Sequence, residues 1–266
     1  MFDSFGRRID YLRISITDRC NLRCTYCMPC GHFRPLVPQR ILTLEEILDT
    51  VVAAADLGIR KIRLTGGEPL VRRGVVELVR SISAVPGIET VGITTNGILL
   101  ARFARDLKEA GLKALNVSLD TLDPERFREV TQRGRVESVI AGIVAAREAG
   151  IERIKVNTVV GPETSEHDLA AIRAFCRRHG LIHQRIALYS LESDKHDNHE
   201  CDRPLPCEEC NRIRLLSTGL LKPCLHSNEE VQLDLANPAE SLRRTVALKP
   251  ERGTVCTNRS MIEIGG

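Results

Sequence analysis

Six short, mostly apolar runs recur along the first 190 residues, and stretches with the 3.6-residue periodicity of helices separate them. The runs are rich in β-branched residues and lie at residues 10–16, 61–65, 89–94, 113–118, 153–159 and 183–188. Continuous apolar runs of this length are typical of parallel strands that are covered on both faces. The pattern therefore predicts strands that alternate with helices.

The helical stretches carry start and stop signals. The first begins at Thr43, where Glu46 three residues later predicts a capping box, and Gly58 suits the C-terminal cap. Similar helices are predicted at residues 74–84, 101–110, 135–148 and 165–178. Repeated strand–helix units form right-handed crossovers and a parallel sheet. Six units predict an α/β fold, a partial (βα)6 TIM-type barrel rather than a closed eight-stranded one.

The periodicity stops at Leu191. Cysteines and prolines crowd residues 201–224, and residues 213–216 are strand-like. We therefore place a domain boundary near residue 190. Residues 1–190 are predicted to form the barrel, and residues 191–266 a small metal-bound appendage.

Composition excludes several classes of protein. The 266 residues carry 38 basic and 35 acidic side chains, a net charge of +3, which argues against a general nucleic-acid-binding protein. The chain shows no apolar leader and no run of about 18 apolar residues, so we expect a cytoplasmic protein with no membrane span. In a reducing compartment, ten cysteines bind metal or do redox work more often than they form disulfides.

The residues with the richest chemistry lie at the ends of the predicted strands and in the loops that follow them. In a parallel α/β barrel these loops build the active site, so we expect the residues to converge. They are Cys20, Cys24, Tyr26, Cys27, Gly66, Gly67, Glu68, Thr94, Ser118, Lys155 and Asn157.

The spacing Cys20-x3-Cys24-x2-Cys27 supplies three thiolates, which suit an iron–sulfur cluster or zinc. Three ligands would leave one iron of a four-iron cluster open to another molecule. A structural zinc site is the alternative, although zinc loops usually carry paired C-x2-C knuckles. In the following Gly-Gly-Glu-Pro loop, glycines let a ligand approach the main chain, and Glu68 can accept a hydrogen bond from an ammonium group. An ordinary turn is the alternative there.

These motifs resemble those of the radical S-adenosylmethionine superfamily. The resemblance implies a [4Fe–4S] cluster whose open iron chelates S-adenosylmethionine and splits it to a 5′-deoxyadenosyl radical. The cofactor does the hard chemistry, and the protein positions and shields it. By the same resemblance, the cluster would be held by Cys20, Cys24 and Cys27, and S-adenosylmethionine by Tyr26, Gly66, Gly67, Glu68, Ser118 and Asn157.

A second set, Cys207-x2-Cys210-x13-Cys224, again offers three thiolates. Spacing alone leaves open a second cluster or a Cys3His zinc site completed by His226. Two arginines, Arg212 and Arg214, follow at i and i+2 and therefore project to one face of a strand. Arginine forks suit phosphate, which favours an anionic nucleotide beside a second open cluster. A solvated charged turn is the alternative.

Longer motifs resemble the GTP 3′,8-cyclases, radical enzymes of molybdenum cofactor biosynthesis. They include LRISITDRCNLRCTYCMP, KIRLTGGEPLVRR, CEECNRIRLLSTGLLKPCL and RSMIEIGG. In that family the adenosyl radical abstracts a ribose hydrogen from GTP and the sugar carbon attacks C8 of guanine, giving (8S)-3′,8-cyclo-7,8-dihydroguanosine 5′-triphosphate.

This narrower resemblance implies a second [4Fe–4S] cluster that binds the purine at its open iron. It also implies an electron donor such as flavodoxin or ferredoxin, allows a homodimer, and places the terminal Gly265 and Gly266 in the active site. Arg212 and Arg214 would be catalytic. The implied cluster ligands are Cys207, Cys210 and Cys224, and the implied GTP contacts are Arg13, Arg63, Thr94, Lys155, Arg212 and Arg214.

Two features depart from the family. Its sixth strand reads approximately R-F-I-E-x-M, whereas residues 185–190 read R-I-A-L-Y-S, and residues 191–205 form an unusually short bridge. These differences change the expected substrate pocket. They favour, as an alternative, a paralogue with the same two clusters that acts on another nucleotide or a small cofactor precursor. A non-catalytic iron–sulfur electron carrier is a further alternative. The intact Gly-Gly-Glu-Pro loop speaks against it, because a carrier needs no S-adenosylmethionine site. Residues without an assigned role are Cys30, Cys176, Cys201, Cys256, His196 and His199.

Overall fold

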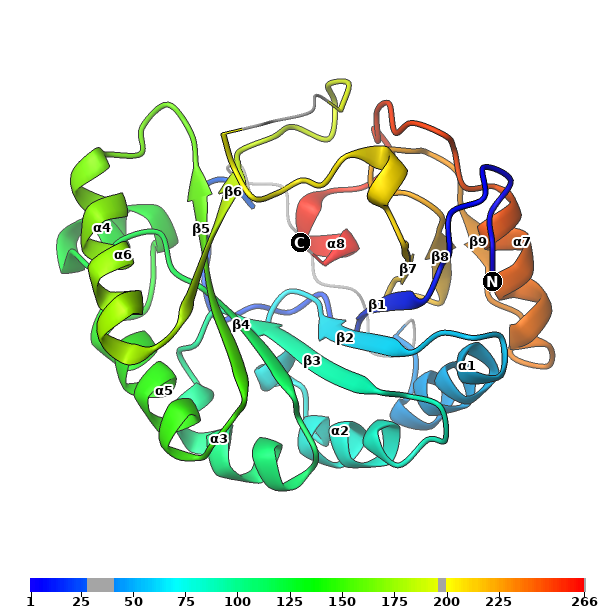
Figure 1. The fold of residues 1–266 in the computed structure, drawn as a ribbon, viewed down its shortest axis with the longest axis horizontal. Coiled ribbons are helices and arrows are strands. Elements are labelled where there is room, and N and C mark those ends of the chain that lie inside the picture. Colours follow the sequence, from blue (N-terminus) through cyan, green and yellow to red (C-terminus); the bar gives the residue numbers. More distant parts are fainter. Residues whose placement is uncertain (28–40, 196–199, 266) are drawn as a thin grey trace.

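The computed structural model describes residues 1–27, 41–195 and 200–265. Its strands form one nine-stranded sheet in the order β6-β5-β4-β3-β2-β1-β7-β8-β9. The sheet curves into an open barrel with helices along its outer surface (Figure 1). The predicted partial α/β barrel is confirmed.

All six predicted barrel strands are present, and each pairs in parallel with the next. They are β1 (Tyr11–Ser15), β2 (Lys61–Thr65), β3 (Thr90–Thr95), β4 (Ala114–Ser118), β5 (Arg153–Val160) and β6 (Ile182–Ala187). The connecting helices are α1 (Leu44–Asp56), α2 (Val75–Ser83), α3 (Leu100–Glu109), α4 (Pro124–Thr131), α5 (Val136–Glu148) and α6 (Glu166–His179), with a 3-10 turn, η2 (Pro69–Val71), before α2.

Local signals account for most helix boundaries. The capping box of Thr43 and Glu46 at the start of α1 is confirmed, and Gly58 follows the helix at a φ of +91°. Helix α4 was not predicted, because its surface is mostly polar. Its start does carry a signal: Asp123 accepts a hydrogen bond from the Arg126 amide, and Pro124 occupies the first turn.

Strand residues alternate between the helix layer and the lumen of the barrel. In β1, Leu12 and Ile14 are completely buried in the main apolar core, so Tyr11 and Arg13 face the lumen. The other barrel strands alternate in the same way. Polar side chains from neighbouring strands therefore share the interior of the barrel.

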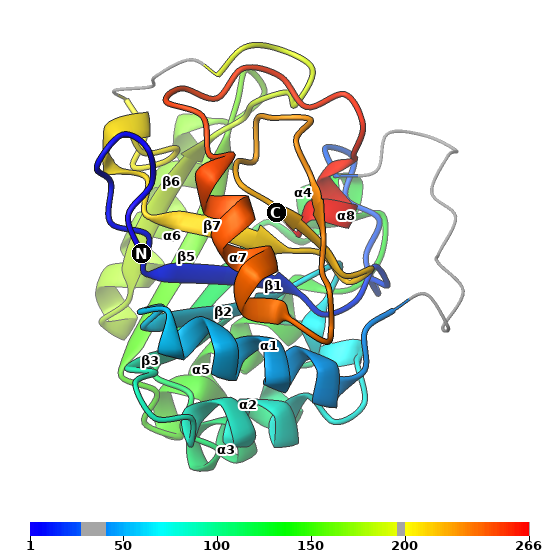
Figure 2. The same cartoon turned by 90° about the vertical axis from the view of Figure 1, so that its right-hand side faces the viewer.

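The C-terminal region continues the barrel sheet. Strand β7 (Arg212–Leu215) runs parallel to β1, and β8 (Leu220–Lys222) and β9 (Val231–Gln232) follow as antiparallel neighbours. Helix α7 (Pro238–Ala247) packs against α1 (Figure 2). The remaining elements are η3 (Cys207–Glu209) and α8 (Met261–Ile264).

The predicted boundary at residue 190 falls between β6 and η3. The division into a barrel and an appendage remains a prediction, although β1 and β7 share one continuous sheet. Among the described residues, no helix is long and apolar enough to cross a membrane.

Candidate active site

Cys20, Cys24 and Cys27 lie on the loop after β1, at the carboxyl end of the barrel strands. The Cys27 amide donates to the Cys24 carbonyl at 3.1 Å, which closes a tight turn between these two ligands. Burial raises the pKa of the Cys24 thiol strongly and that of Cys27 to about 12, and the neighbouring thiols and Asp120 add to both shifts. Three crowded thiolates therefore need positive charge to balance them. The donor set fits a cluster that carries several iron ions.

Gly66 and Gly67 bring the loop after β2 against the backbone of the cysteine loop. A Cβ atom on either glycine would lie 2.4 Å from a main-chain oxygen, that of Thr17 or that of Arg19. The Gly67 and Glu68 amides donate to these two carbonyls at 2.8 Å. The glycines thus permit close approach of protein backbone. From the sequence, we expected the glycines to admit a ligand to the main chain. The contact seen here is one between two protein loops.

Glu68 ties three loops together from a fully buried position. Its carboxylate accepts hydrogen bonds from the Leu70 amide at 2.9 Å, the Thr95 hydroxyl at 2.8 Å and the Asn96 amide at 2.7 Å. Burial raises the pKa of Glu68 to about 7, and these bonds oppose the shift. These bonds hold the loops after β2 and β3 together. The expected bond from Glu68 to an ammonium group stays a prediction.

Tyr26 and Ser118 line one small hollow with Cys24 and Asn96. The Tyr26 hydroxyl donates to Asp120 at 2.8 Å, and Asp120 also accepts from the Val159 amide at 2.8 Å. The Asn96 side-chain nitrogen donates to the side-chain oxygen Oδ1 of Asn21 at 2.7 Å and lies 3.8 Å from the Cys20 sulfur. Asp120 and Asn96 were not assigned roles from the sequence, although both follow predicted strands.

The remaining expected cofactor contact, Asn157, lies directly opposite Ser118 in the β4–β5 register. Both side chains face the lumen, because Val117 and Val156 beside them are completely buried in the core. The structure therefore places Ser118 and Asn157 at one level of the barrel.

A layer of cationic side chains lines the lumen. Arg13 pairs in register with Arg63 on one side and with Arg214 on the other, and Arg212 pairs with Tyr11. Burial, Arg214 and the other arginines lower the pKa of Arg13 to about 9. The neighbouring arginines therefore repel one another's positive charge at this level of the lumen.

Several atoms of this layer have no internal partner. Arg212 Nε, Arg214 Nη1 and the Thr94 hydroxyl are buried and make no hydrogen bond with the described residues. Leaving buried polar atoms unpaired costs free energy, so such atoms mark a place for a ligand. Lys155 lies on the same face of β5 as Asn157, and burial and Arg153 lower its pKa.

Cys207 begins η3, Cys210 follows it, and Cys224 follows β8. Arg212 lies near Cys210, and Arg214 lies near Cys224. Lys195 donates to the Cys207 sulfur at 3.2 Å, and Lys249 to the Cys210 sulfur at 3.3 Å. Burial opposes ionisation of Cys210, but Lys249 and Arg212 outweigh it and lower its pKa to about 7. The second set therefore presents at least one thiol that ionises readily.

The C-terminus enters the lumen through α8 (Figure 1). The Gly265 carbonyl accepts hydrogen bonds from the Thr65 hydroxyl at 3.1 Å and from Arg13 Nη2 at 3.3 Å. Gly265 has a φ of +75°, and a Cβ there would lie 2.9 Å from the Thr65 methyl carbon. Both the backbone angle and the space therefore require glycine. Gly266 lies outside the described residues.

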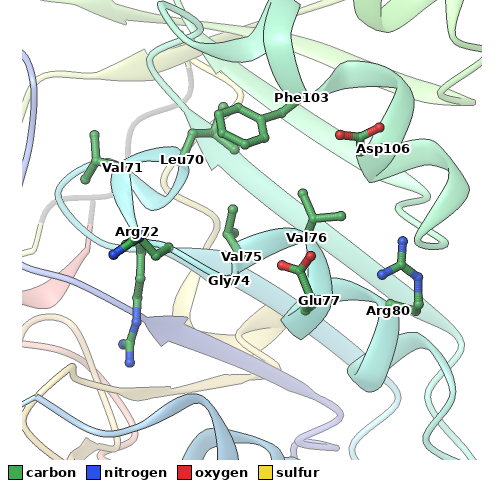
Figure 3. A pocket seen from close by; sticks show the side chains of 11 residues that line it. Leu70, Val71, Arg72, Gly74, Val75, Val76, Glu77, Arg80, Phe103 and Asp106 are labelled. Carbon is green, nitrogen blue, oxygen red and sulfur yellow. The ribbon is translucent and has the colours of Figure 1, made fainter.

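Other candidate residues are not brought into this lumen. Cys176 and Cys256 are buried in apolar clusters, and Cys201 is half-buried. Cys30, His196 and His199 lie outside the described residues. A separate hollow on the outer surface is lined by η2, α2 and α3, including Leu70, Arg80 and Phe103 (Figure 3). It carries none of the expected site residues.

Comparison with known proteins identifies the relatives of the chain. The model of the radical SAM superfamily matches residues 14–176. A GTP 3′,8-cyclase of Alkaliphilus oremlandii is 38% identical over 321 positions, covering 100% of both chains. One of Geobacter sulfurreducens is 36% identical over 328 positions, covering 100% of this chain and 99% of the relative. The first alignment exceeds the 266 residues of this chain by 55 positions, in agreement with a shortened chain.

Solved structures support the fold. Streptococcus suis SuiB bound to its precursor peptide SuiA matches with a TM-score of 0.65 at 17% identity, over 83% of this chain and 60% of that chain. Methylornithine synthase matches with a TM-score of 0.56 at 19% identity, over 70% of this chain and 55% of that chain. These likenesses show a shared barrel.

Proposed function

Because the chain belongs to the radical S-adenosylmethionine superfamily and, within it, to the GTP 3′,8-cyclases, we propose that its lumen binds GTP and joins C3′ of the ribose to C8 of the guanine. The chain is a radical S-adenosylmethionine enzyme of the type that acts in molybdenum cofactor biosynthesis. The observation that carries the substrate assignment is the layer of buried, incompletely hydrogen-bonded guanidinium groups, which lies next to Cys210 and Cys224 of the second cysteine set.

Cys20, Cys24 and Cys27 would hold the first [4Fe–4S] cluster. When bound, this cluster supplies the electron that splits S-adenosylmethionine to a 5′-deoxyadenosyl radical. The protein's part is to hold and shield the cofactor. Tyr26 and Ser118 line the hollow beside Cys24, and Asn157 lies opposite Ser118. Glu68 fixes the loop of Gly66 and Gly67 against the cysteine loop, which keeps these side chains in place.

The lumen cations would bind the triphosphate and orient the sugar. Arg13, Arg63, Lys155 and Arg212 provide positive charge, and the Thr94 hydroxyl provides a further donor. Bound phosphate would complete the hydrogen bonds that the protein leaves unmade, which accounts for the cost of burying these groups. The Gly265 carbonyl accepts a hydrogen bond from Arg13. The C-terminal tail would thereby fix the Arg13 guanidinium and help to exclude water from the lumen.

We assign a second [4Fe–4S] cluster, rather than zinc, to Cys207, Cys210 and Cys224. A single zinc ion needs ligands that converge to about 2.3 Å from one point. Within residues 1–27, 41–195 and 200–265, no three His, Cys, Asp or Glu side chains converge closely enough to hold one ion. Cysteines bound to different irons of a cluster lie further apart. Lys195 and Lys249, which donate to two of the sulfurs, would balance the charge of such a cluster.

We place the enzyme in the cytoplasm, with a small reductant such as flavodoxin or ferredoxin as electron donor. Free thiols at both cysteine sets and the need for a reduced cluster support this placement.

The proposal is tested by anaerobic incubation of reconstituted enzyme with S-adenosylmethionine, a reductant and GTP. We expect a cyclised nucleotide, identified by mass spectrometry, together with an equal amount of 5′-deoxyadenosine. ATP in place of GTP is the control and is expected to give neither. Formation of 5′-deoxyadenosine that does not respond to GTP, with no cyclised product, would favour the paralogue with another substrate.

A further inference from the structure

One arginine in the lumen comes from the short bridge between β6 and η3. Arg203 forms a parallel bridge with Ile186, and its carbonyl accepts from the Ala187 amide at 2.9 Å. This single residue therefore extends the barrel wall beyond β6. The bridge is the part of the chain that departs most from the family pattern, and no family motif includes Arg203.

The side chain of Arg203 points into the lumen. When the Gln184 amide oxygen faces the cations, it accepts from Arg203 Nε at 3.2 Å and from Lys155 Nζ at 3.3 Å, while the Gln184 nitrogen donates to Asn157 at 3.2 Å. Arg203 Nη1 is buried and has no hydrogen-bond partner among the described residues. The Nε side of the guanidinium is thus held by Gln184, and Nη1 is a buried donor that the described residues leave unpaired.

The charges around Arg203 place it in the cationic layer of the lumen. Burial, Arg212 and Arg63 lower its pKa, and Tyr11 and Asp202 oppose this. Through Gln184, Arg203 is also joined to Lys155 and Asn157. Arg203 therefore belongs to the same group of cations as Arg63, Arg212 and Lys155.

The arginine of β6 itself does not serve the lumen. Arg185 lies opposite Thr158, which is completely buried in the helix-side layer, so Arg185 faces outward. Its guanidinium is 40% exposed and lies 3.8 Å from the Asp202 carboxylate. The position that the family motif aligns with a strand-6 arginine is therefore turned away from the site, and the bridge supplies an arginine in its place.

We propose that Arg203 is a substrate-positioning residue that binds the polyphosphate chain of the nucleotide, together with Lys155 and Arg63. This inference rests on the proposed function in that it takes the ligand to be a nucleoside triphosphate. Arg203 Nη1, which the described residues leave without a partner, can donate to a phosphate oxygen, and a polyphosphate would add to the negative charge that Asp202 presents to Arg203 and Lys155.

The test separates the phosphates from the nucleoside. Binding of GTP, guanosine and inorganic tripolyphosphate to the reconstituted enzyme is measured by calorimetry for the wild type, Arg203→Ala and Arg203→Lys. We expect Arg203→Ala to weaken GTP and tripolyphosphate about 10- to 100-fold and guanosine less than about twofold. Arg203→Lys should fall between. The matched control is Arg185→Ala, which removes an outward-facing arginine and leaves the main-chain bond from Arg185 to Asp202 intact.

Each outcome decides one claim. Unchanged tripolyphosphate binding in Arg203→Ala, or equal weakening of guanosine and GTP, would overturn the role of Arg203. Equal effects of Arg203→Ala and Arg185→Ala would do the same. If the wild type binds tripolyphosphate through Arg203 but neither binds guanosine nor cyclises GTP, the proposed function fails while the phosphate site stands.

Discussion

Replacement of Cys24 by alanine is expected to reduce the iron content from about eight to about four per chain and to abolish 5′-deoxyadenosine formation. Cys24 is one of three half-buried thiols on one loop, and burial, Cys27, Asp120 and Cys20 raise its pKa. Two remaining ligands do not hold a four-iron cluster firmly. The rate of 5′-deoxyadenosine formation should fall at least about 1000-fold, because no other group among the described residues of the barrel can deliver the electron. Iron analysis and chromatography of the cleaved cofactor measure both effects.

Two variants sharpen this expectation. Cys176→Ala removes a buried thiol of α6 that packs in the core, and it should keep full iron content and activity. Cys210→Ala should lose about four irons and the GTP reaction, yet still cleave S-adenosylmethionine. A Cys24→Ala enzyme that cleaves S-adenosylmethionine at the wild-type rate would refute the ligand assignment. Four irons plus one zinc in the wild type would refute the second cluster.

Replacement of Arg214 by alanine is expected to lower formation of the cyclised nucleotide by about 100-fold without lowering the melting temperature. The guanidinium is only 5% exposed, and its Nη1 atom has no hydrogen-bond partner among the described residues. Burial and the nearby Arg212 lower its pKa, although Tyr189 and Cys224 oppose this. Removal of an unbalanced buried cation relieves repulsion in the free enzyme, whereas the loss of a charged hydrogen bond to substrate costs about 1.5–3 kcal/mol.

Lys222 offers the contrasting case. It is completely buried, but it donates to the Ser227 carbonyl at 2.7 Å and to Glu230 at 3.3 Å. Lys222→Met should therefore destabilise the fold by about 1–3 kcal/mol, since it leaves the buried Ser227 carbonyl without its donor and Glu230 with Arg259 as its remaining partner. If Arg214→Ala lowered the melting temperature as much as Lys222→Met, Arg214 would be a structural residue, and the substrate role would be withdrawn.

The strands and most helices of the barrel follow directly from local pattern. The run at residues 61–65, whose Ile62 and Leu64 are buried in the core, forms the predicted strand, and the capping box at Thr43 fixes the start of α1. Helices α4 and α7 were missed although each begins with a capping side chain, Asp123 or Asn237, followed by a proline in the first turn. The pairing of β7 with β1 joins residues that are some 200 positions apart, and no local signal encodes such a contact.

The site was predictable to the level of loops, but the contacts of each residue were not. The position of Glu68 after a strand is a local property, whereas its burial under Thr95 and Asn96 depends on how two loops dock. Arg203 lies in a bridge without periodicity, so only the fold shows that it reaches the lumen. The inward or outward direction of Arg185 likewise depends on the strand register.

The most direct test of the central claim is the fate of deuterium from GTP labelled at C3′. A 3′,8-cyclase must remove the hydrogen from the carbon that then bonds to C8. With the reconstituted wild-type enzyme, deuterium is expected in the methyl group of 5′-deoxyadenosine, in step with formation of the cyclised nucleotide. Label that stays in unreacted GTP while unlabelled 5′-deoxyadenosine accumulates would contradict the account.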